Sequence, residues 1–353
     1  MIRRQRLLVL LTAALGMLSS AVASPNADLL ANALARHGER TTLTLTVDAG
    51  SIATTIPITV VAGSRPGKTL LALAGVHGSE YSPIIATQRL APRLDPTQLQ
   101  GAVIFVHTAN VPAYFGRTIY SSPADGKNLN RVFPGRADGT LTERIAHTLT
   151  SVVYPHADAA LDLHSGDGNE QLRPSWVGYY AKSGTAQTIA ASRAMALAFG
   201  LPSIVEFQST FSGPEEAIWG GSAAVMQGIP SIDVEAGGMG IIDEVAIAQI
   251  EDGLLRVMDH LGILPADLDP PPPARFIRER GSISAPAEGA WVALIDAGTP
   301  VTEGELIGYL TNLHGERIFE ARAPMAGTLL IRLEAPPVLR GETLAVIGRY
   351  EAP

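Results

Sequence analysis

Two apolar segments of this sequence are each followed within a few residues by a histidine. Residues 70–74 lead through Gly75 to His77, and residues 160–163 lead to His164. Short runs that are apolar on both faces are typical of strands buried inside an α/β sheet. Because open α/β sheets bind their ligands beyond the carboxyl ends of the strands, the pattern predicts that both histidines lie at the functional edge of one sheet.

Strand-like and helix-like segments alternate from about residue 41 to residue 262. Strands are expected at 43–47, 56–61, 70–74, 103–106, 159–163, 175–180, 203–207 and 230–234. Helices are expected at 79–90, 140–153, 185–199 and 242–261. The first strands follow one another without helices between them, so the sheet is predicted to be mixed. The sequence therefore predicts a three-layer α/β domain over residues 24–264.

A proline-rich segment follows this domain. It predicts a stiff linker at residues 265–275, and glycines at regular intervals beyond it predict a small all-β barrel or sandwich at 276–353. That part resembles the biotinyl/lipoyl carrier module, yet the last lysine of the chain is Lys182, so no lysine there can be acylated. We therefore expect a structural or pocket-shaping role for it.

The N-terminus has the order of a secretory signal. Arg3, Arg4 and Arg6 precede the apolar run 7–18, and small residues follow it. An uncleaved membrane anchor is the alternative, but a bilayer span needs about 20 apolar residues. We expect residues 1–23 to be removed and the mature protein to be periplasmic or secreted, without stable membrane insertion.

Charge and cysteine content narrow the chemistry. The formal net charge of −8 becomes −11 when the three arginines of the signal are removed, and no basic block follows them, so nucleic acid is not expected as a partner. The chain has no cysteine, which excludes disulfides, a thiol nucleophile and a thiolate metal site. Any metal site must use histidine, aspartate and glutamate.

His77, Glu80 and His164 are the candidate metal ligands. Residues three apart at the start of a helix point the same way, so His77 and Glu80 can converge on one cation. Two histidines and a carboxylate with one open position are typical of catalytic zinc. Asp162 lies on the same face of its strand as His164, where it either steadies that histidine or makes a hydrogen bond at the strand end. His107 is the only other histidine at a strand end and is the substitute ligand.

A long loop over residues 115–135 carries the candidate substrate-binding charges. Loops of this length in compact domains are usually functional. Arg117 and Arg131 could each grip a carboxylate in a bidentate manner, or could lie on the solvated surface. Farther along, Asp233 and Glu235 share a face at the end of a strand, where one could take a proton from water or could cap the following glycine turn.

Four motifs in order resemble those of the succinylglutamate desuccinylase/aspartoacylase family, a branch of the zinc carboxypeptidase superfamily. The motifs are His77-Gly-Ser-Glu80, Asn128-Leu-Asn-Arg-Val-Phe-Pro-Gly135, Asp162-Leu-His164 and Val234-Glu235. The resemblance covers about residues 55–350 and includes the β-rich tail. It implies a zinc-carboxypeptidase-like fold for the α/β domain.

The resemblance also implies roles for particular residues. His77, Glu80 and His164 would bind one zinc ion, Glu235 would be the general base, and Arg117 would polarise the carbonyl of the scissile bond.

Asn130 and Arg131 would hold a carboxylate of the substrate. Asn128 stands where the family often has aspartate.

The function expected from the sequence is that of an exported zinc-dependent deacylase, which hydrolyses the amide bond of N-acyl amino acids. One alternative is a metallocarboxypeptidase acting on peptide C-termini, including those of cell-wall peptides. Another is a non-enzymatic metal-binding or ligand-binding protein on the same scaffold. The number of subunits, the acyl group and the amino acid are left open.

Overall fold

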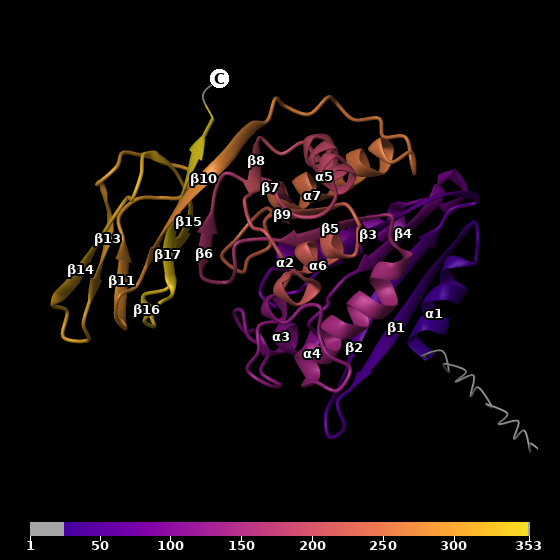
Figure 1. Cartoon of the computed structure of the whole chain (residues 1–353), viewed down its shortest axis with the longest axis horizontal. Coiled ribbons are helices and arrows are strands. Elements are labelled where there is room, and N and C mark those ends of the chain that lie inside the picture. The colour runs from indigo at the N-terminus through magenta and orange to yellow at the C-terminus, as the bar shows by residue number, and fades with distance from the viewer. Residues whose placement is uncertain (1–24, 352–353) are drawn as a thin grey trace, which may run out of the picture.

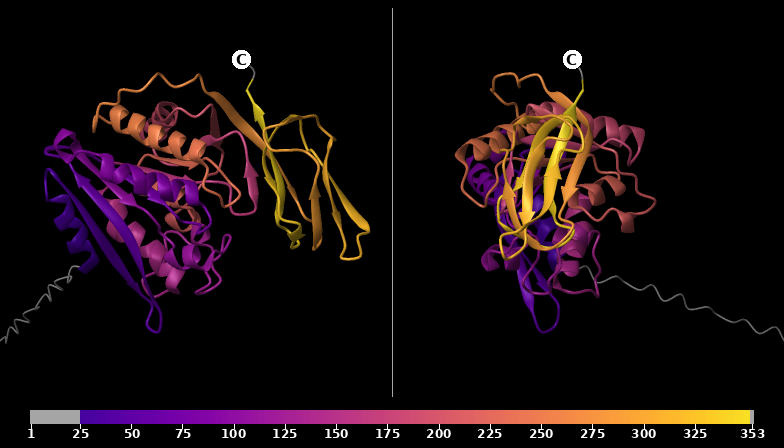
Figure 2. Two further views of the ribbon diagram at one scale, coloured as in Figure 1. Left: turned by 180° about the vertical axis from the view of Figure 1, so that it is seen from behind. Right: turned by 90° about the vertical axis from the view of Figure 1, so that its left-hand side faces the viewer.

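The computed structural model describes residues 25–351, so the predicted signal peptide lies outside the described residues. Within that range, none of the helices combines the length and the apolar character that crossing a bilayer requires. An α/β part and a lobe of C-terminal strands lie side by side along the longest axis (Figures 1 and 2).

The α/β part is built on a mixed sheet. Its main strands are β1 (Glu39–Asp48), β2 (Ala53–Ala62), β3 (Arg65–Ala74), β4 (Gln100–Val106), β5 (Ala159–His164), β7 (Trp176–Tyr180), β8 (Ser203–Phe207) and β9 (Ser231–Glu235). They lie in the order β1-β2-β4-β3-β5-β9-β7-β8. Strands β4, β3, β5 and β9 are parallel neighbours, whereas β1, β2 and β7 run against a neighbour. The predicted mixed α/β fold is confirmed.

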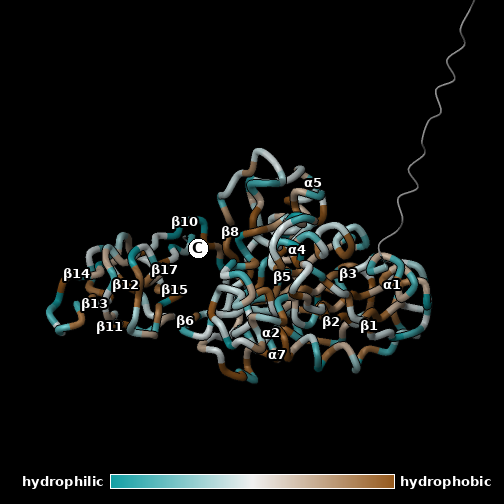
Figure 3. Tube along the Cα trace, turned by 90° about the horizontal axis from the view of Figure 1, so that it is seen from below, coloured by the Kyte–Doolittle hydropathy of each residue, from teal (hydrophilic) through white to brown (hydrophobic). Residues whose placement is uncertain are grey.

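Helices cover both faces of this sheet, which makes three layers. They are α1 (Pro25–Leu34), α2 (Tyr81–Leu90), α3 (Val111–Gly116), α4 (Leu141–Thr148), α5 (Ala186–Phe199), α6 (Gly220–Met226) and α7 (Glu244–His260). Helices α2, α5 and α7 pack in one core, on one face. Helices α1, α4 and α6 pack in the other. Hydrophobic residues accordingly concentrate in the interior around β3 and β5 (Figure 3).

Local signals explain where several helices begin and end. The main chain of Thr140 donates to Glu143 Oε2 at 2.8 Å before α4, and a π-helical turn, Leu149–Val153, extends that helix. Helix α5 begins after Thr185, whose hydroxyl accepts from the main chain of Thr188, and ends at Gly200, where φ is +89°. These two helices match the predicted ranges within two residues.

The C-terminal strands do not stand apart from the main sheet. They are β10 (Arg275–Ser284), β11 (Gly289–Ala293), β12 (Pro300–Val301), β13 (Leu306–Thr311), β14 (Arg317–Arg322), β15 (Gly327–Leu333), β16 (Pro337–Val338) and β17 (Thr343–Tyr350). Strand β10 pairs in parallel with β8, and β17, β15 and β12 follow it in the same sheet. A short strand of the α/β part, β6 (Glu170–Leu172), pairs with β15. Strands β14, β13, β11 and β16 form a second sheet, and the predicted domain boundary stays a prediction.

We predict that Leu161→Ala lowers the free energy of unfolding by about 2–5 kcal/mol, because Leu161 is fully buried in the central strand β5. Chemical denaturation of both proteins measures the loss. Leu339→Ala is the control, since Leu339 is 63% exposed and its truncation is expected to change stability by less than about 0.5 kcal/mol. Equal effects of the two substitutions would contradict the position of β5 in the core.

Candidate metal centre and pocket

His77, Glu80 and His164 come together at the carboxyl ends of β3 and β5. The two strands are parallel neighbours, so the β3–α2 connection and the end of β5 meet at one edge. Glu80 Oε1 lies 2.8 Å from His77 Nδ1, and Glu80 Oε2 lies 2.9 Å from His164 Nδ1. All three side chains are buried, with possible ligand atoms within 4.8 Å of one another. The group could therefore hold one metal ion.

Two glycines fix the path of the β3–α2 connection. Gly75 has φ +68°, and a Cβ there would lie 2.8 Å from the Cα of Thr108. A Cβ on Gly78 would lie 2.2 Å from the main chain of Ala113 in α3. Because only glycine fits at such close approaches, the backbone on either side of His77 is held against two neighbouring segments.

The carboxylates at and around these three side chains stabilise a positive charge at this position. Burial alone would lower the pKa of His77, but Asp167 and Glu80 outweigh it and raise that pKa to about 9. Burial would raise the pKa of Glu80, yet the imidazoles of His164 and His77 lower it to about 2. A divalent cation would provide the positive charge that these carboxylates attract, so the donor set fits a metal ion.

The second nitrogen of each imidazole also has a neighbour. Asp162 Oδ1 lies 3.0 Å from His164 Nε2, and Asn128 Oδ1 lies 3.1 Å from His77 Nε2. The other carboxylate oxygen of Asp162 accepts from the main chain of Gly221 at 2.9 Å. Such partners orient a metal-binding histidine and select its tautomer, which leaves Nδ1 of both rings facing Glu80.

Glu235 ends β9 beside His164, its register partner on β5. Its side chain is half-buried, and burial raises its pKa well above the usual range. Two residues earlier, on the same face of the strand, Asp233 accepts from Tyr180 Oη at 2.8 Å, and burial raises its pKa to about 7. A carboxyl group with a raised pKa beside a metal site is suited to accept and return a proton.

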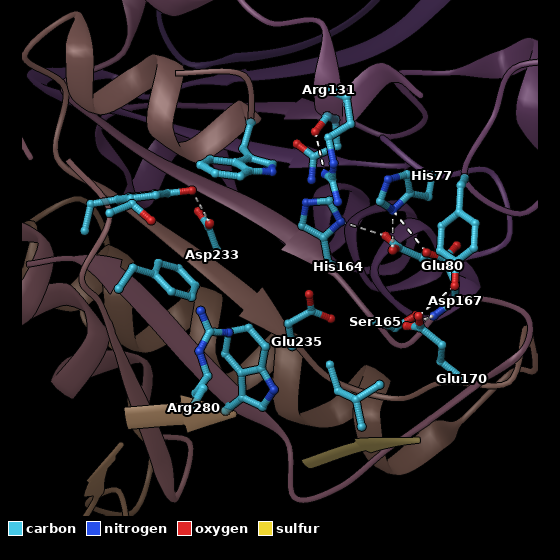
Figure 4. A pocket seen from close by; sticks show the side chains of 18 residues that line it. His77, Glu80, Arg131, His164, Ser165, Asp167, Glu170, Asp233, Glu235 and Arg280 are labelled. Atoms are coloured by element: carbon cyan, nitrogen blue, oxygen red, sulfur yellow. Dashed lines mark hydrogen bonds and ion pairs between the residues drawn. The ribbon is translucent and has the colours of Figure 1, made fainter. Parts of the chain in front are cut away.

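These residues line a pocket of about 350 Å³, within the range of sites for small molecules (Figure 4). Its walls come from the sheet edge, from the loops after β4 and β5, and from the C-terminal strands. The lining residues are His77, Glu80, Tyr120, Asn130, Arg131, His164, Ser165, Asp167, Glu170, Trp176, Tyr180, Phe207, Ser209, Trp219, Asp233, Glu235, Arg280 and Ile331.

The structure brings Asn130 and Arg131 to this pocket but not Arg117. Asn130 Oδ1 accepts from the main chain of Gly220 at 3.0 Å, and Arg131 donates to the main-chain carbonyl of Asn130 at 2.7 Å. Arg117 is exposed at the end of α3, with φ +51°, and does not line the pocket. His107 is bonded to the hydroxyls of Thr59 and Thr87, away from the metal group.

Several pocket residues were not among the predicted ones, and four of them are Asp167, Glu170, Tyr120 and Arg280. Asp167 and Glu170 follow His164 in the β5–β6 loop, and this proximity in sequence is a signal that could have indicated them. Tyr120 donates to Glu170 at 2.7 Å and has φ +58°. Arg280 belongs to β10, and nothing near it in the sequence relates it to the histidines.

Together, the fold and the site define an α/β protein with a candidate metal centre in a small-molecule pocket. Residues 66–261 match the model of the succinylglutamate desuccinylase/aspartoacylase catalytic domain. The N-alpha-acetyl-L-2,4-diaminobutyric acid deacetylase of Halomonas elongata is 34% identical over 300 residues, covering 83% of this chain and 85% of that protein.

Solved structures agree with this match. A succinylglutamate desuccinylase from Silicibacter sp. TM1040 has a TM-score of 0.77 at 30% identity, covering 89% of this chain and 95% of that one. The product-bound ectoine utilization protein EutE (DoeB) from Ruegeria pomeroyi has a TM-score of 0.78 at 29% identity, covering 88% and 95%. The chain belongs to the succinylglutamate desuccinylase/aspartoacylase family, as its motifs predicted, and thus to a family of deacylases.

We predict that His164→Ala abolishes stoichiometric binding of zinc, because it removes one of three converging donors. Asp162→Asn is expected to weaken binding about 10- to 100-fold, since it alters the partner of His164 Nε2. Calorimetric titration with zinc measures both. His314→Ala, at an exposed histidine, is the control. Full zinc stoichiometry in a folded His164→Ala protein would place the metal elsewhere.

Proposed function

We propose that this protein is an exported, zinc-dependent amidohydrolase that removes the acyl group from N-acyl amino acids. The observation that carries the proposal is the position of Glu235 beside the His77–Glu80–His164 group in one pocket. Membership of a deacylase family supports it.

His77, Glu80 and His164 would hold the zinc ion. Bound there, zinc would supply Lewis-acid chemistry, which makes water a usable nucleophile near neutral pH. Glu235 would accept a proton from the attacking water and pass it to the nitrogen of the leaving amine.

Asn130 and Arg131 would hold the carboxylate of the amino acid. Arg131 presents a planar fork to the pocket, and the contact of Asn130 with the start of α6 fixes that part of the loop. Water would attack directly, so no covalent acyl-enzyme is expected.

The dimensions of the pocket favour a small substrate over a peptide. Its volume is about 350 Å³, and Arg280 and Ile331 from the C-terminal strands form part of its wall. The relative from Halomonas elongata is named for the deacetylation of N-acetyl-2,4-diaminobutyric acid, a molecule of fitting size.

We predict that zinc-loaded protein hydrolyses N-acyl amino acids and that a chelator abolishes this activity. Short peptides with free C-termini are expected to react much more slowly, because Arg280 of β10 and Ile331 of β15 form a wall of this small pocket. Amine release across a panel of both substrate types measures the preference. Faster hydrolysis of peptides would instead favour the carboxypeptidase alternative.

Glu235→Gln is expected to lower kcat by at least about 100-fold while zinc binding is retained, because the amide cannot accept the proton. Steady-state kinetics and zinc titration on the same preparation separate the two effects. Glu303→Gln, at an exposed position in the turn between β12 and β13, is the matched control. An active Glu235→Gln protein would remove this residue from the mechanism.

The proposal of export rests on the first 23 residues, with their basic start and apolar run. We expect the mature protein to begin at Ser24. Mass spectrometry of the N-terminus after expression of the full chain in a bacterium, with separation of periplasm and cytoplasm, measures this. An intact Met1 on cytoplasmic protein would contradict it.

A further inference from the structure

Strand β10 contains a β-bulge where it passes from the α/β part to the C-terminal strands. It pairs in parallel with β8 up to Ile277 and antiparallel with β17 from Ile277 onward. Ile277 lies opposite Tyr350 of β17. Two residues later, Glu279 lies opposite Arg349, the direct neighbour of Tyr350. Arg278 is therefore an extra residue in β10, and such a residue bends a strand.

The bulge determines on which face of the sheet Arg280 lies. Side chains alternate along a regular strand, so residues three apart, such as Ile277 and Arg280, would point to opposite faces. With the extra residue between them they share a face, because their partners Tyr350 and Gly348 lie two apart on β17. This face is that of the pocket, since the guanidinium carbon of Arg280 lies 4.9 Å from the ring centre of the pocket residue Phe207. Figure 4 shows the side chain of Arg280 among the pocket residues.

A buried carboxylate on the opposite face binds the extra residue. Glu206 of β8 is 7% exposed; its Oε1 accepts from Tyr179 Oη at 2.6 Å, and its Oε2 accepts from Arg278 Nε. These three side chains form the bulge cluster. The hydrogen bond with Glu206 raises the pKa of Arg278, which also pairs with Glu351 at 2.6 Å. Because a buried carboxylate is stable only with such partners, the cluster ties β10 to β8 where their main-chain pairing ends.

The bulge cluster lies directly behind the wall of the pocket. Tyr179 and Glu206 are register partners on β7 and β8. The residues that follow them, Tyr180 and Phe207, line the pocket. Because neighbouring residues of a strand point to opposite faces, the cluster and the wall occupy the two faces of the same strands. A displacement of the bulge on one face would therefore move Arg280 on the other.

A second ion pair near the bulge has different surroundings. Arg349 of β17 pairs with Glu279 at 2.8 Å, and both side chains are exposed. Exposed ion pairs contribute little to stability, whereas a buried carboxylate must keep its partners. The bulge cluster, rather than this pair, is therefore expected to fix the bulge.

We propose that Glu206 and Arg278 are positioning residues, which fix the β-bulge of β10 and thereby hold Arg280 in the wall of the pocket. Where it predicts kinetics the inference rests on the proposed function, and where it predicts the place of Arg280 it rests on the strand register alone. The metal group belongs to the ends of β3 and β5, so loss of the pair should change substrate affinity and leave the chemical step intact.

The place of Arg280 is measured without substrate, by NMR of its Nε–Hε group. This signal is assigned by its loss in Arg280→Lys and is expected to carry the ring-current shift of Phe207. Arg278→Met keeps the apolar stem but removes the guanidinium, and it should move the signal toward that of an exposed arginine. Arg349→Met, on the neighbouring strand, is the matched control and should leave the signal in place. An unmoved signal in folded Arg278→Met protein overturns the inference.

Steady-state kinetics use the best substrate of the N-acyl amino acid panel described above. Arg278→Met is expected to raise KM about 3- to 10-fold with kcat changed less than about twofold. Glu206→Gln should have the same effect, since it removes the other half of the pair, and Arg278→Lys should restore part of the affinity. Arg349→Met should behave as the wild type.

A double variant tests whether the pair acts through Arg280. In an Arg280→Ala protein, Arg278→Met should change KM less than about twofold, because the side chain that it positions is already absent. A full rise of KM in that background overturns the inference and leaves the amidohydrolase. If no amide is hydrolysed by the wild type, the proposed function fails, and the NMR comparison alone decides the inference.

Discussion

The carboxylate of Glu80, buried between two imidazoles, is the interaction on which the site depends. A buried charge is tolerated only where hydrogen bonds and opposite charge compensate it, and here His77 and His164 approach its two oxygens at 2.8 and 2.9 Å. Since His164 is delivered by β5, the register of that strand is constrained. A slip by one residue would turn His164 to the opposite face and leave Glu80 without its partner.

The parts of the site predicted from the sequence are those with local signals. His77 and His164 each come at the end of an apolar strand, and Glu80 comes three residues after His77. These local patterns indicate the three residues without knowledge of the whole fold. Strand order is different, because it depends on pairing between distant segments. Strand β4 lies between β2 and β3, although it follows both in the chain, and no local pattern indicates this arrangement.

The positions of Arg117 and Arg280 could not be predicted from local sequence patterns either. Arg117 lies near the motif of Asn128, yet the loop between them leads its side chain into solvent, because spacing within a long loop does not determine its path. Arg280 lies far from every motif and reaches the pocket because β10 pairs with β8. Proximity in sequence therefore indicated neither the exposed position of Arg117 nor the place of Arg280 in the pocket.

The parallel pairing of β8 with β10 ties the two halves of the molecule into one sheet. A gene fragment limited to the family-matched residues 66–261 would leave β8 as an exposed edge, with unpaired main-chain groups prone to aggregation. It would also lack one wall of its own pocket. Separated from the strands that follow it, the α/β part would lose both the partner of its edge strand and a wall of its pocket.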